Sequence, residues 1–164
     1  MASWAELEAE APEFACRVRE RLDAGTHKTI ATLRRDGSPR ISGTEADFVA
    51  GDLWFGSMSG AMKARDLQRD PRFALHSASA DPSEWEGDAK VAGTVEEITD
   101  PERFQEFRRR QAAEAGEDEP KGPAEYHLFR AEITEAVLIG LNPERTKMVI
   151  EHWHEGRGID RLER

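Results

Sequence analysis

Residues 29–76 decide the fold and read TIATLRRDGSPRISGTEADFVAGDLWFGSMSGAMKARDLQRDPRFALH. Short runs of β-branched and aromatic residues alternate here with turns that contain glycine, aspartate and proline, a pattern typical of antiparallel strands. We expect strands at residues 29–33, 40–49, 52–57 and 73–79, with turns at 34–39 and 50–52. This part of the chain therefore predicts a strand meander or a small barrel.

A serine- and glycine-rich elbow, Ser57–Gly60, joins the strand at 52–57 to a short basic helix. The helix carries Lys63 and Arg65 and ends before Pro71. Backbone N–H groups in such an elbow and at a helix N-terminus favour an anion, and a lysine adds a positive charge. The elbow is therefore predicted to hold a phosphate group.

The regions outside this stretch predict helices at both ends of a β-rich middle. Residues 1–25 form an N-terminal helical segment, which Ser3 and Glu6 begin with a capping box and Pro12 interrupts. A strand at 88–98 precedes a helix that Asp100 caps and Pro101 opens. The composition of the remaining residues predicts a surface loop at 115–123, strands at 126–141 and 146–153, and a polar tail at 154–164.

The fold expected from these patterns is mostly β with flanking helices. Six or seven antiparallel strands form a barrel, and residues 1–164 form a single domain, because no repeat or linker marks a second one.

Composition narrows the classes of function. The formal net charge of −10 argues against a general nucleic-acid binder, which needs a basic stripe. A local pocket can still oppose the global sign and bind a small phosphorylated ligand. The single cysteine, Cys16, excludes an internal disulfide and a multi-cysteine metal site. No apolar run reaches the length of a membrane span, and no export signal is visible, so we expect a cytoplasmic protein without membrane contact.

Four histidines raise the question of a metal or haem site: His76, His127, His152 and His154. His152 and His154 share one face of a strand, as metal ligands often do. No cysteine or carboxylate accompanies them in a recognisable motif, so no metal ligand is assigned from the sequence. Haem binding by the same histidines is an alternative. The arginine run at 108–110 is expected to be a solvated helix face.

Residues 29–75 resemble the pyridoxamine 5′-phosphate oxidase-like split β-barrel family, whose members bind FMN or a deazaflavin. The resemblance lies in the order and spacing of several pieces and extends over most of residues 26–153. These pieces are Ala31–Pro39, Leu53–Phe55, Lys63–Leu67, Asp70–Leu75 and Gly93–Glu96. The resemblance implies an FMN-binding split barrel that forms a homodimer, with the cofactor at the subunit interface.

The resemblance also implies roles for individual residues. Lys63 falls at the lysine that contacts the cofactor phosphate, with Ser57 and Ser59 beside it. Arg40 falls at the start of the strand that lines the flavin ring in the family, and Ile41 and Ser42 follow it along the ring edge. Trp153 of the partner chain closes the groove. On electrostatic grounds, a backbone N–H or Lys90 near the ring would stabilise the reduced, anionic cofactor, because a positive field lowers the cost of charge there. The cofactor-binding set is Arg40, Ile41, Ser42, Gly56, Ser57, Ser59, Met62, Lys63, Arg65, Lys90 and Trp153.

Two positions depart from the family pattern. Met62 stands where the oxidases place a phosphate-binding arginine, and Glu163 stands where they have a substrate-binding histidine. Arg65 or Ser59 is the candidate to replace the missing arginine. Because of these departures, the sequence does not predict oxidation of pyridoxamine phosphate.

The function expected from the resemblance is hydride transfer between a flavin or deazaflavin and a small organic substrate. FMN and the deazaflavin coenzyme F-420 both remain open, because residues 63–72 also resemble the branch of the family that uses F-420. No catalytic side chain is predicted, since the cofactor would do the chemistry. The alternative is a non-enzymatic FMN- or haem-binding protein used for storage or sensing.

Overall fold

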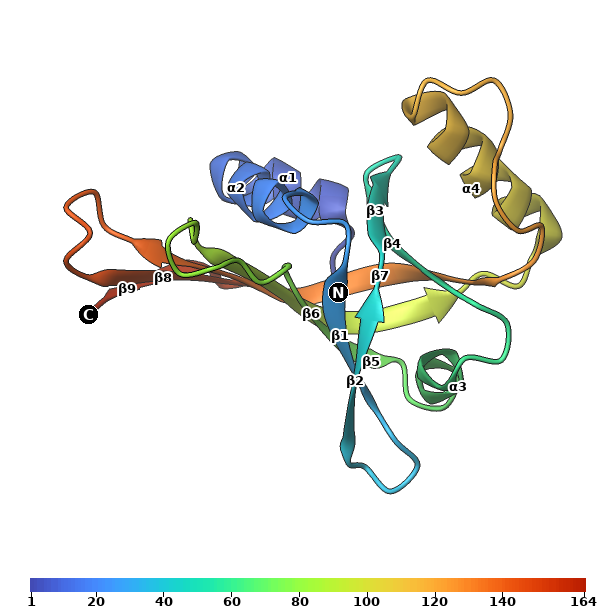
Figure 1. Ribbon diagram of the computed structural model, residues 1–164, viewed down its shortest axis with the longest axis horizontal. Coiled ribbons are helices and arrows are strands. Elements are labelled where there is room, and N and C mark those ends of the chain that lie inside the picture. The colour runs from blue at the N-terminus through green and yellow to red at the C-terminus, as the bar shows by residue number, and fades with distance from the viewer.

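The structure is a computed structural model that describes residues 1–164, with nine strands and four helices (Figure 1). The helices are α1 (Trp4–Glu10), α2 (Pro12–Asp23), α3 (Met62–Arg69) and α4 (Pro101–Glu114). The strands are β1 (Lys28–Leu33), β2 (Pro39–Thr44), β3 (Ala46–Val49), β4 (Asp52–Ser57), β5 (Arg72–His76), β6 (Asp88–Glu97), β7 (His127–Leu141), β8 (Met148–His154) and β9 (Gly158–Glu163).

All strands belong to one antiparallel sheet in the order β2-β1-β5-β6-β7-β4-β3, to which β8 and β9 are added. Strand β7 organises the sheet because it pairs with β6 on one edge and with both β4 and β8 on the other. The end strands β2 and β3 do not pair with each other, so the sheet does not close. The predicted antiparallel, mostly β fold with flanking helices is confirmed.

The strand count exceeds the expected six or seven for two reasons. The predicted strand at 40–49 is two strands, because the chain changes partners at Glu45: β2 pairs with β1, whereas β3 pairs with β4. The predicted polar tail at 154–164 contains β9, which pairs with β8. Most of the side chains of β9 are exposed, which explains why its sequence lacks the apolar alternation of a half-buried strand.

The helix boundaries agree with the expected caps. Ser3 and Glu6 form a complete capping box at the start of α1, and Pro12 begins α2. Asp100 caps α4 by accepting a hydrogen bond from the Arg103 N–H, and Pro101 follows it. None of the four helices combines the length and the apolar character that crossing a membrane requires.

The main core lies between the sheet and helices α1 and α2, which pack on one of its faces (Figure 1). Trp4, Leu7, Val18 and Leu22 from these helices are fully buried. The opposite face of the sheet carries no helix along β5, β6, β7 and β8. Figure 1 also shows that the β8–β9 hairpin extends away from the body of the molecule, on the side opposite α3 and α4.

A β-bulge in β7 changes which of its side chains face the core. Ala92 pairs with Glu135 and Gly93 pairs with Ile133, which leaves Thr134 as an extra residue. Odd-numbered residues of β7 are buried from 129 to 133, and even-numbered residues are buried from 136 to 138. The bulge thus reverses the inward and outward alternation and places Glu135 on the helix-free face.

Candidate functional site

The main candidate site is a groove of about 760 Å³ beside the elbow at 57–60. One wall comes from the ends of β2 and β4, and the opposite wall from α4 and the segment that follows it. The lining residues are His27, Gly43, Thr44, Glu45, Asp47, Trp54, Gly56, Ser57, Met58, Ser59, Ala61, Lys63, Phe107, Gln111, Lys121, Pro123, Glu125, Tyr126 and Leu128. Four predicted binding residues meet here: Gly56, Ser57, Ser59 and Lys63.

The elbow presents polar groups that have no partner within the chain. Ser57 is 6% exposed, and its hydroxyl makes no hydrogen bond although the atom is fully buried. A buried hydroxyl without a partner is unfavourable, and such groups in native proteins are usually satisfied by something that binds. The adjoining helix α3 has no side-chain cap at its N-terminus, where Ala61 occupies the cap position. Both features suit an anionic ligand.

Lys63 extends from the first turn of α3 back to β2. Its Nζ donates a hydrogen bond to the Gly43 carbonyl oxygen at 2.7 Å. Desolvation by burial lowers the pKa of Lys63, and the nearby carboxylate of Glu45 only partly offsets this effect. The ammonium group is therefore held in the groove with less hydration than an exposed lysine has, a condition under which an incoming anion is strongly favoured.

A chain of hydrogen bonds connects the elbow to β7, β6 and α3. The Gly60 N–H donates to His127 Nε2 at 3.2 Å, and His127 Nδ1 lies 2.8 Å from Glu97 Oε1. Because Nε2 accepts, the ring proton is on Nδ1 and is donated to Glu97. Gln68 of α3 donates to the same carboxylate. His127 is thus a positioning residue for the elbow in this geometry.

Arg40 contributes to the position of α3. Its Nε donates to Asp66 Oδ2 at 2.6 Å, while Arg69 and Thr32 also donate to the same carboxylate. Burial alone would raise the pKa of Asp66, but these three hydrogen bonds outweigh it and hold the pKa below its usual value. The buried carboxylate therefore ties α3 to β1 and β2. The side chain predicted to meet the flavin ring is engaged in this network.

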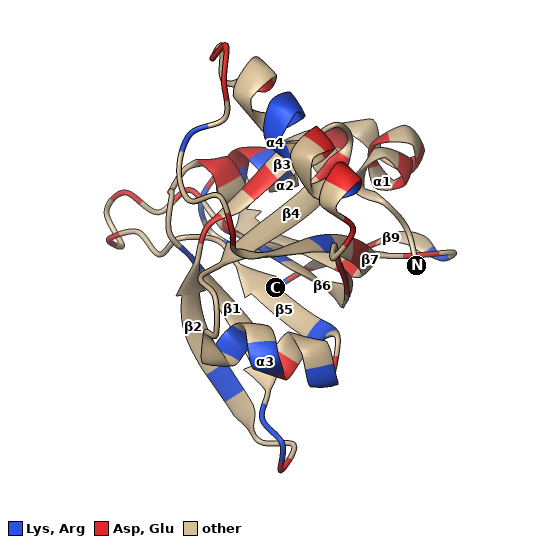
Figure 2. Ribbon diagram, turned by 90° about the vertical axis from the view of Figure 1, so that its right-hand side faces the viewer, with Lys and Arg blue, Asp and Glu red and all other residues tan.

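Figure 2 shows that Lys and Arg gather on and around α3, whereas Asp and Glu gather on α1. Helix α3 carries Lys63, Arg65 and Arg69 against one acidic residue, Asp66. A local positive end therefore exists on a chain whose net charge is −10. Arg65 is exposed, and Met62 is 52% exposed at the start of the helix. Met62 stands where the family pattern has an arginine. Lys63, Arg65 and Arg69 are the positive charges that α3 retains near that position.

The remaining predicted residues lie away from the groove. Ile41, which is 75% exposed, and Lys90 line a second cavity of about 500 Å³ on the helix-free face of the sheet. Ser42 is half-buried on β2, where it pairs with Ile30. Ile41 and Lys90 are thus separated from the four predicted residues that line the groove.

The prediction for Trp153 is wrong. Its side chain has no exposed surface and belongs to the main core. It alternates on β8 with His152 and His154, so it faces inward when they face outward. A side chain buried in its own core cannot close the groove of a partner chain.

Sequence reasoning missed the wall that α4 and the following segment supply. Tyr126 packs against Phe104 with ring centroids 4.9 Å apart, and Phe107 packs against Trp54 at 4.7 Å. Burial raises the pKa of Tyr126. The apolar face of Phe104 and Phe107 was visible in the sequence, but nothing local indicated that it faces β4.

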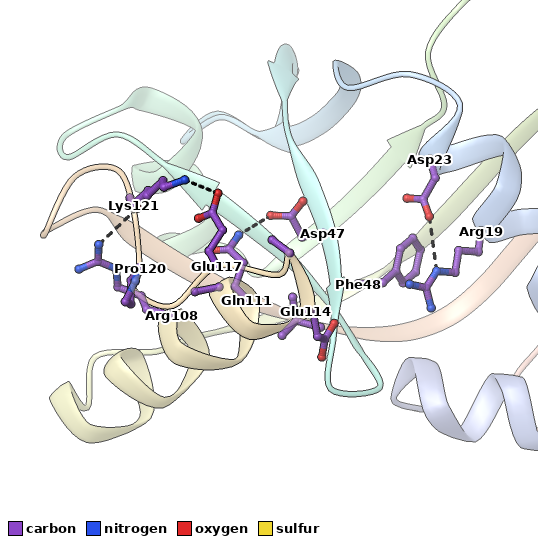
Figure 3. A pocket seen from close by; sticks show the side chains of 13 residues that line it. Arg19, Asp23, Asp47, Phe48, Arg108, Gln111, Glu114, Glu117, Pro120 and Lys121 are labelled. Atoms are coloured by element: carbon purple, nitrogen blue, oxygen red, sulfur yellow. Dashed lines mark hydrogen bonds and ion pairs between the residues drawn. The ribbon is translucent and has the colours of Figure 1, made fainter.

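A third cavity, of about 480 Å³, lies between α2, β3 and α4 (Figure 3). Four of its charged groups form ion pairs: Lys121 with Glu117 at 2.7 Å and Arg19 with Asp23 at 3.4 Å. Gln111 donates to Asp47 at 2.7 Å. Because these groups satisfy one another, the cavity has less capacity for a charged ligand than the groove. In the arginine run, Arg109 and Arg110 both pair with Glu106 on the exposed face of α4.

Comparisons with known proteins agree with this architecture. The model of the family described as pyridoxamine 5′-phosphate oxidase matches residues 17–140. No functionally curated protein matches the chain. Similar solved structures include a pyridoxamine 5′-phosphate oxidase-related, FMN-binding protein from Nostoc punctiforme. It has 13% identity and a TM-score of 0.64, and the match covers 93% of this chain and 95% of that one.

Two further solved structures share the fold. One is described as an F420 reductase, with 20% identity and a TM-score of 0.53, over 72% of this chain and 94% of that one. The other is the haem storage protein HutZ from Vibrio cholerae, with 18% identity and a TM-score of 0.56, over 76% and 89% respectively. At these identities the likeness concerns the fold alone.

Proposed function

Because this chain belongs to the pyridoxamine 5′-phosphate oxidase family, we propose that it is a homodimeric oxidoreductase that binds FMN or coenzyme F-420 in the groove beside the elbow. The observation that carries the proposal is the buried, unpartnered hydroxyl of Ser57 next to the desolvated ammonium of Lys63. When bound, either cofactor supplies a ring that accepts or donates a hydride to a small organic substrate.

The residues present fit the phosphate group that FMN and F-420 share. Ser57 offers a hydroxyl donor, Ser59 lines the same end of the groove, and Lys63 supplies the charge. The first N–H groups of α3 are available because no side chain caps that helix. Charge-assisted hydrogen bonds of this kind are shorter and stronger than neutral ones.

The residues beyond the phosphate end fit an extended aromatic ring. Trp54, Phe107, Tyr126 and Leu128 form one apolar cluster that lines the groove. Gly56 leaves room on β4, where a Cβ would lie 3.7 Å from the Tyr126 ring. Large apolar walls with a few placed polar groups are typical of cofactor sites. The walls would also exclude water from the ring, which limits side reactions of the reduced cofactor.

The homodimer is supported by the helix-free face of the sheet. Register and alternation place Val137, Ile139, Ile150 and Leu162 together on this face, with Ile41 further along it. None of these five side chains is fully buried. Apolar side chains that no layer covers are unfavourable in water, and a second copy of the chain is the partner that the family architecture implies.

The test is to titrate the apo-protein separately with FMN, F-420 and haemin and to follow binding by optical spectroscopy. Its outcomes distinguish the proposal from the alternatives. The proposal expects one FMN or F-420 per chain and hydride exchange between the bound cofactor and a reductant. Stoichiometric binding without exchange would assign the protein to storage or sensing. A Soret band with no flavin or deazaflavin binding would contradict the proposal in favour of haem.

A further inference from the structure

Three side chains that can bind a metal ion meet on the helix-free face of the sheet, beside the turn of the β8–β9 hairpin. They are Glu135 of β7 and His152 and His154 of β8, and their ligand atoms all lie within 4.8 Å of one another. All three are half-buried. The sequence showed the two histidines on one face but gave no sign of the carboxylate.

The register of β7 and β8 explains why these three side chains lie close together. Glu135 lies directly opposite His154, and His152 is two residues away on the same strand. Residues paired across antiparallel strands, and residues two apart on one strand, point to the same face. Trp153 lies between the histidines and points into the core, which fixes the direction of both imidazoles.

The bulge in β7 is what brings Glu135 to this face. In an unbroken strand, Glu135 would follow Ala131 and Ile133 into the core. The extra residue Thr134 reverses the alternation, and Gly93 on β6 makes the bulge sterically feasible, since a Cβ there would lie 1.9 Å from the Glu132 carbonyl oxygen. Bulges that re-aim a side chain are over-represented beside functional sites.

The distances suit a small divalent cation. His152 Nε2 lies 3.0 Å and His154 Nε2 lies 3.5 Å from Glu135 Oε2. A tetrahedral Zn²⁺ with bonds of about 2.0–2.1 Å places its ligand atoms roughly 3.3–3.5 Å apart, so only small movements are needed. On the same face, Asp160 of β9 lies opposite His152 and offers a further carboxylate.

We propose that Glu135, His152 and His154 form a binding site for a divalent transition-metal ion of the Zn²⁺ type. Two imidazoles and one carboxylate are the donor set that zinc sites with an open fourth position use. The ion would take the place of the direct contact between His152 Nε2 and Glu135 Oε2, which lie 3.0 Å apart. The site lies on the helix-free face of the sheet, away from the elbow, and Glu135 also lines the 500 Å³ cavity on that face.

The test uses the full chain without an affinity tag, stripped with a chelator and titrated with Co²⁺ as a spectroscopic probe. We expect one Co²⁺ per chain, visible d–d absorption bands and displacement by Zn²⁺. His152→Ala and His154→Ala should each lower the affinity more than about tenfold, since even the partners of metal ligands contribute that much. Glu135→Gln, which keeps the shape of the side chain, should have the same effect.

His27→Ala is the control, because it removes an exposed imidazole that lines the groove and not the helix-free face, and it should leave Co²⁺ binding unchanged. Circular dichroism and the thermal midpoint of each apo-variant establish that it is folded. Equal Co²⁺ affinity in wild type and the His152 and His154 variants would overturn the proposal. So would a haemin Soret band that depends on these histidines in a protein that does not bind Co²⁺.

Discussion

Ser57 and Ser77 are two buried serines in opposite hydrogen-bonding states. The Ser57 hydroxyl has no partner, whereas the Ser77 hydroxyl accepts a hydrogen bond from the Ala89 N–H at 3.1 Å. Ser57→Ala should leave the stability of the apo-protein unchanged or raise it, because an unsatisfied group is removed. The same variant should weaken cofactor binding by about tenfold, as a hydrogen bond to a charged group is lost.

Ser77→Ala should behave in the reverse manner. It leaves the Ala89 N–H without its acceptor and should lower the free energy of unfolding by about 1–2 kcal/mol, with no change in cofactor affinity. Chemical denaturation and fluorescence titration of both variants measure the two effects. Loss of stability in Ser57→Ala without loss of affinity would show that Ser57 is a structural residue only.

The buried carboxylate of Asp66 is predicted to matter for stability. Asp66→Asn removes the charge that Arg40 and Arg69 share and should lower the free energy of unfolding by about 3 kcal/mol, the lower end for a broken buried pair because both arginines are partly exposed. Urea denaturation measures the change. The control is Glu106→Gln, a carboxylate that also faces two arginines but is exposed, and its denaturation midpoint should not move.

The pH dependence of this contribution has a definite sign. The pKa of Asp66 is lowered in the folded protein, so the unfolded chain binds the proton more readily in acid. The stabilisation is complete above the ordinary pKa of 3.8 and is lost as the pH falls through the lower folded value. The stability difference between wild type and Asp66→Asn should therefore shrink below pH 4, and a difference that stayed constant there would contradict the pKa assignment.

At the scale of elements, the bulge between β6 and β7 depends on Gly93. A Cβ at this position would meet the Glu132 carbonyl oxygen at 1.9 Å, so Gly93→Ala should destabilise the protein by at least about 2 kcal/mol through forced backbone movement. Gly140 on β7 is the control, since a Cβ there meets nothing within 4 Å. Thermal denaturation of the two alanine variants should show a loss only for Gly93, and two equal midpoints would mean that the bulge adapts freely.

The elements that were predictable from the sequence are those with local signals. The capping box at Ser3, the proline at 12 and the cap at Asp100 fixed the helix starts, because each acts within three or four residues. The serine and glycine residues at 57–60 were also a local signal, and they predicted the elbow. The division of the predicted 40–49 strand at Glu45 had no local signal. It arises because the residues before Glu45 pair with β1 and those after it pair with β4.

The parts of the site that escaped prediction depend on contacts between distant segments. Gly60 and His127 are 67 residues apart, and Glu97 of β6 contacts His127 on the neighbouring strand β7, 30 residues later in the chain. Glu135 reached the outer face only because of a register shift opposite Gly93. The inward direction of Trp153 follows from strand alternation, but the resemblance to the family outweighed that signal in the sequence interpretation.

At the scale of the whole molecule, the helix-free sheet face predicts self-association. Ile139→Asp places a charge among the apolar side chains of this face and should convert a dimer into a monomer in light scattering at micromolar concentration. Ala113→Asp adds the same charge on the exposed surface of α4 and should leave the dimer intact. A monomeric wild type would contradict the proposed assembly and leave the apolar face unexplained.

The most direct test of the proposed function asks whether the elbow recognises a phosphate. The measurement compares the affinity of the apo-protein for FMN with that for riboflavin, or for F-420 with that for its deazariboflavin core, by fluorescence titration. Wild type should prefer the phosphate-bearing form by about ten- to a hundredfold, Lys63→Ala should lose most of that preference, and the surface control Arg109→Ala should retain it. Equal wild-type affinity for the two members of each pair would contradict the account.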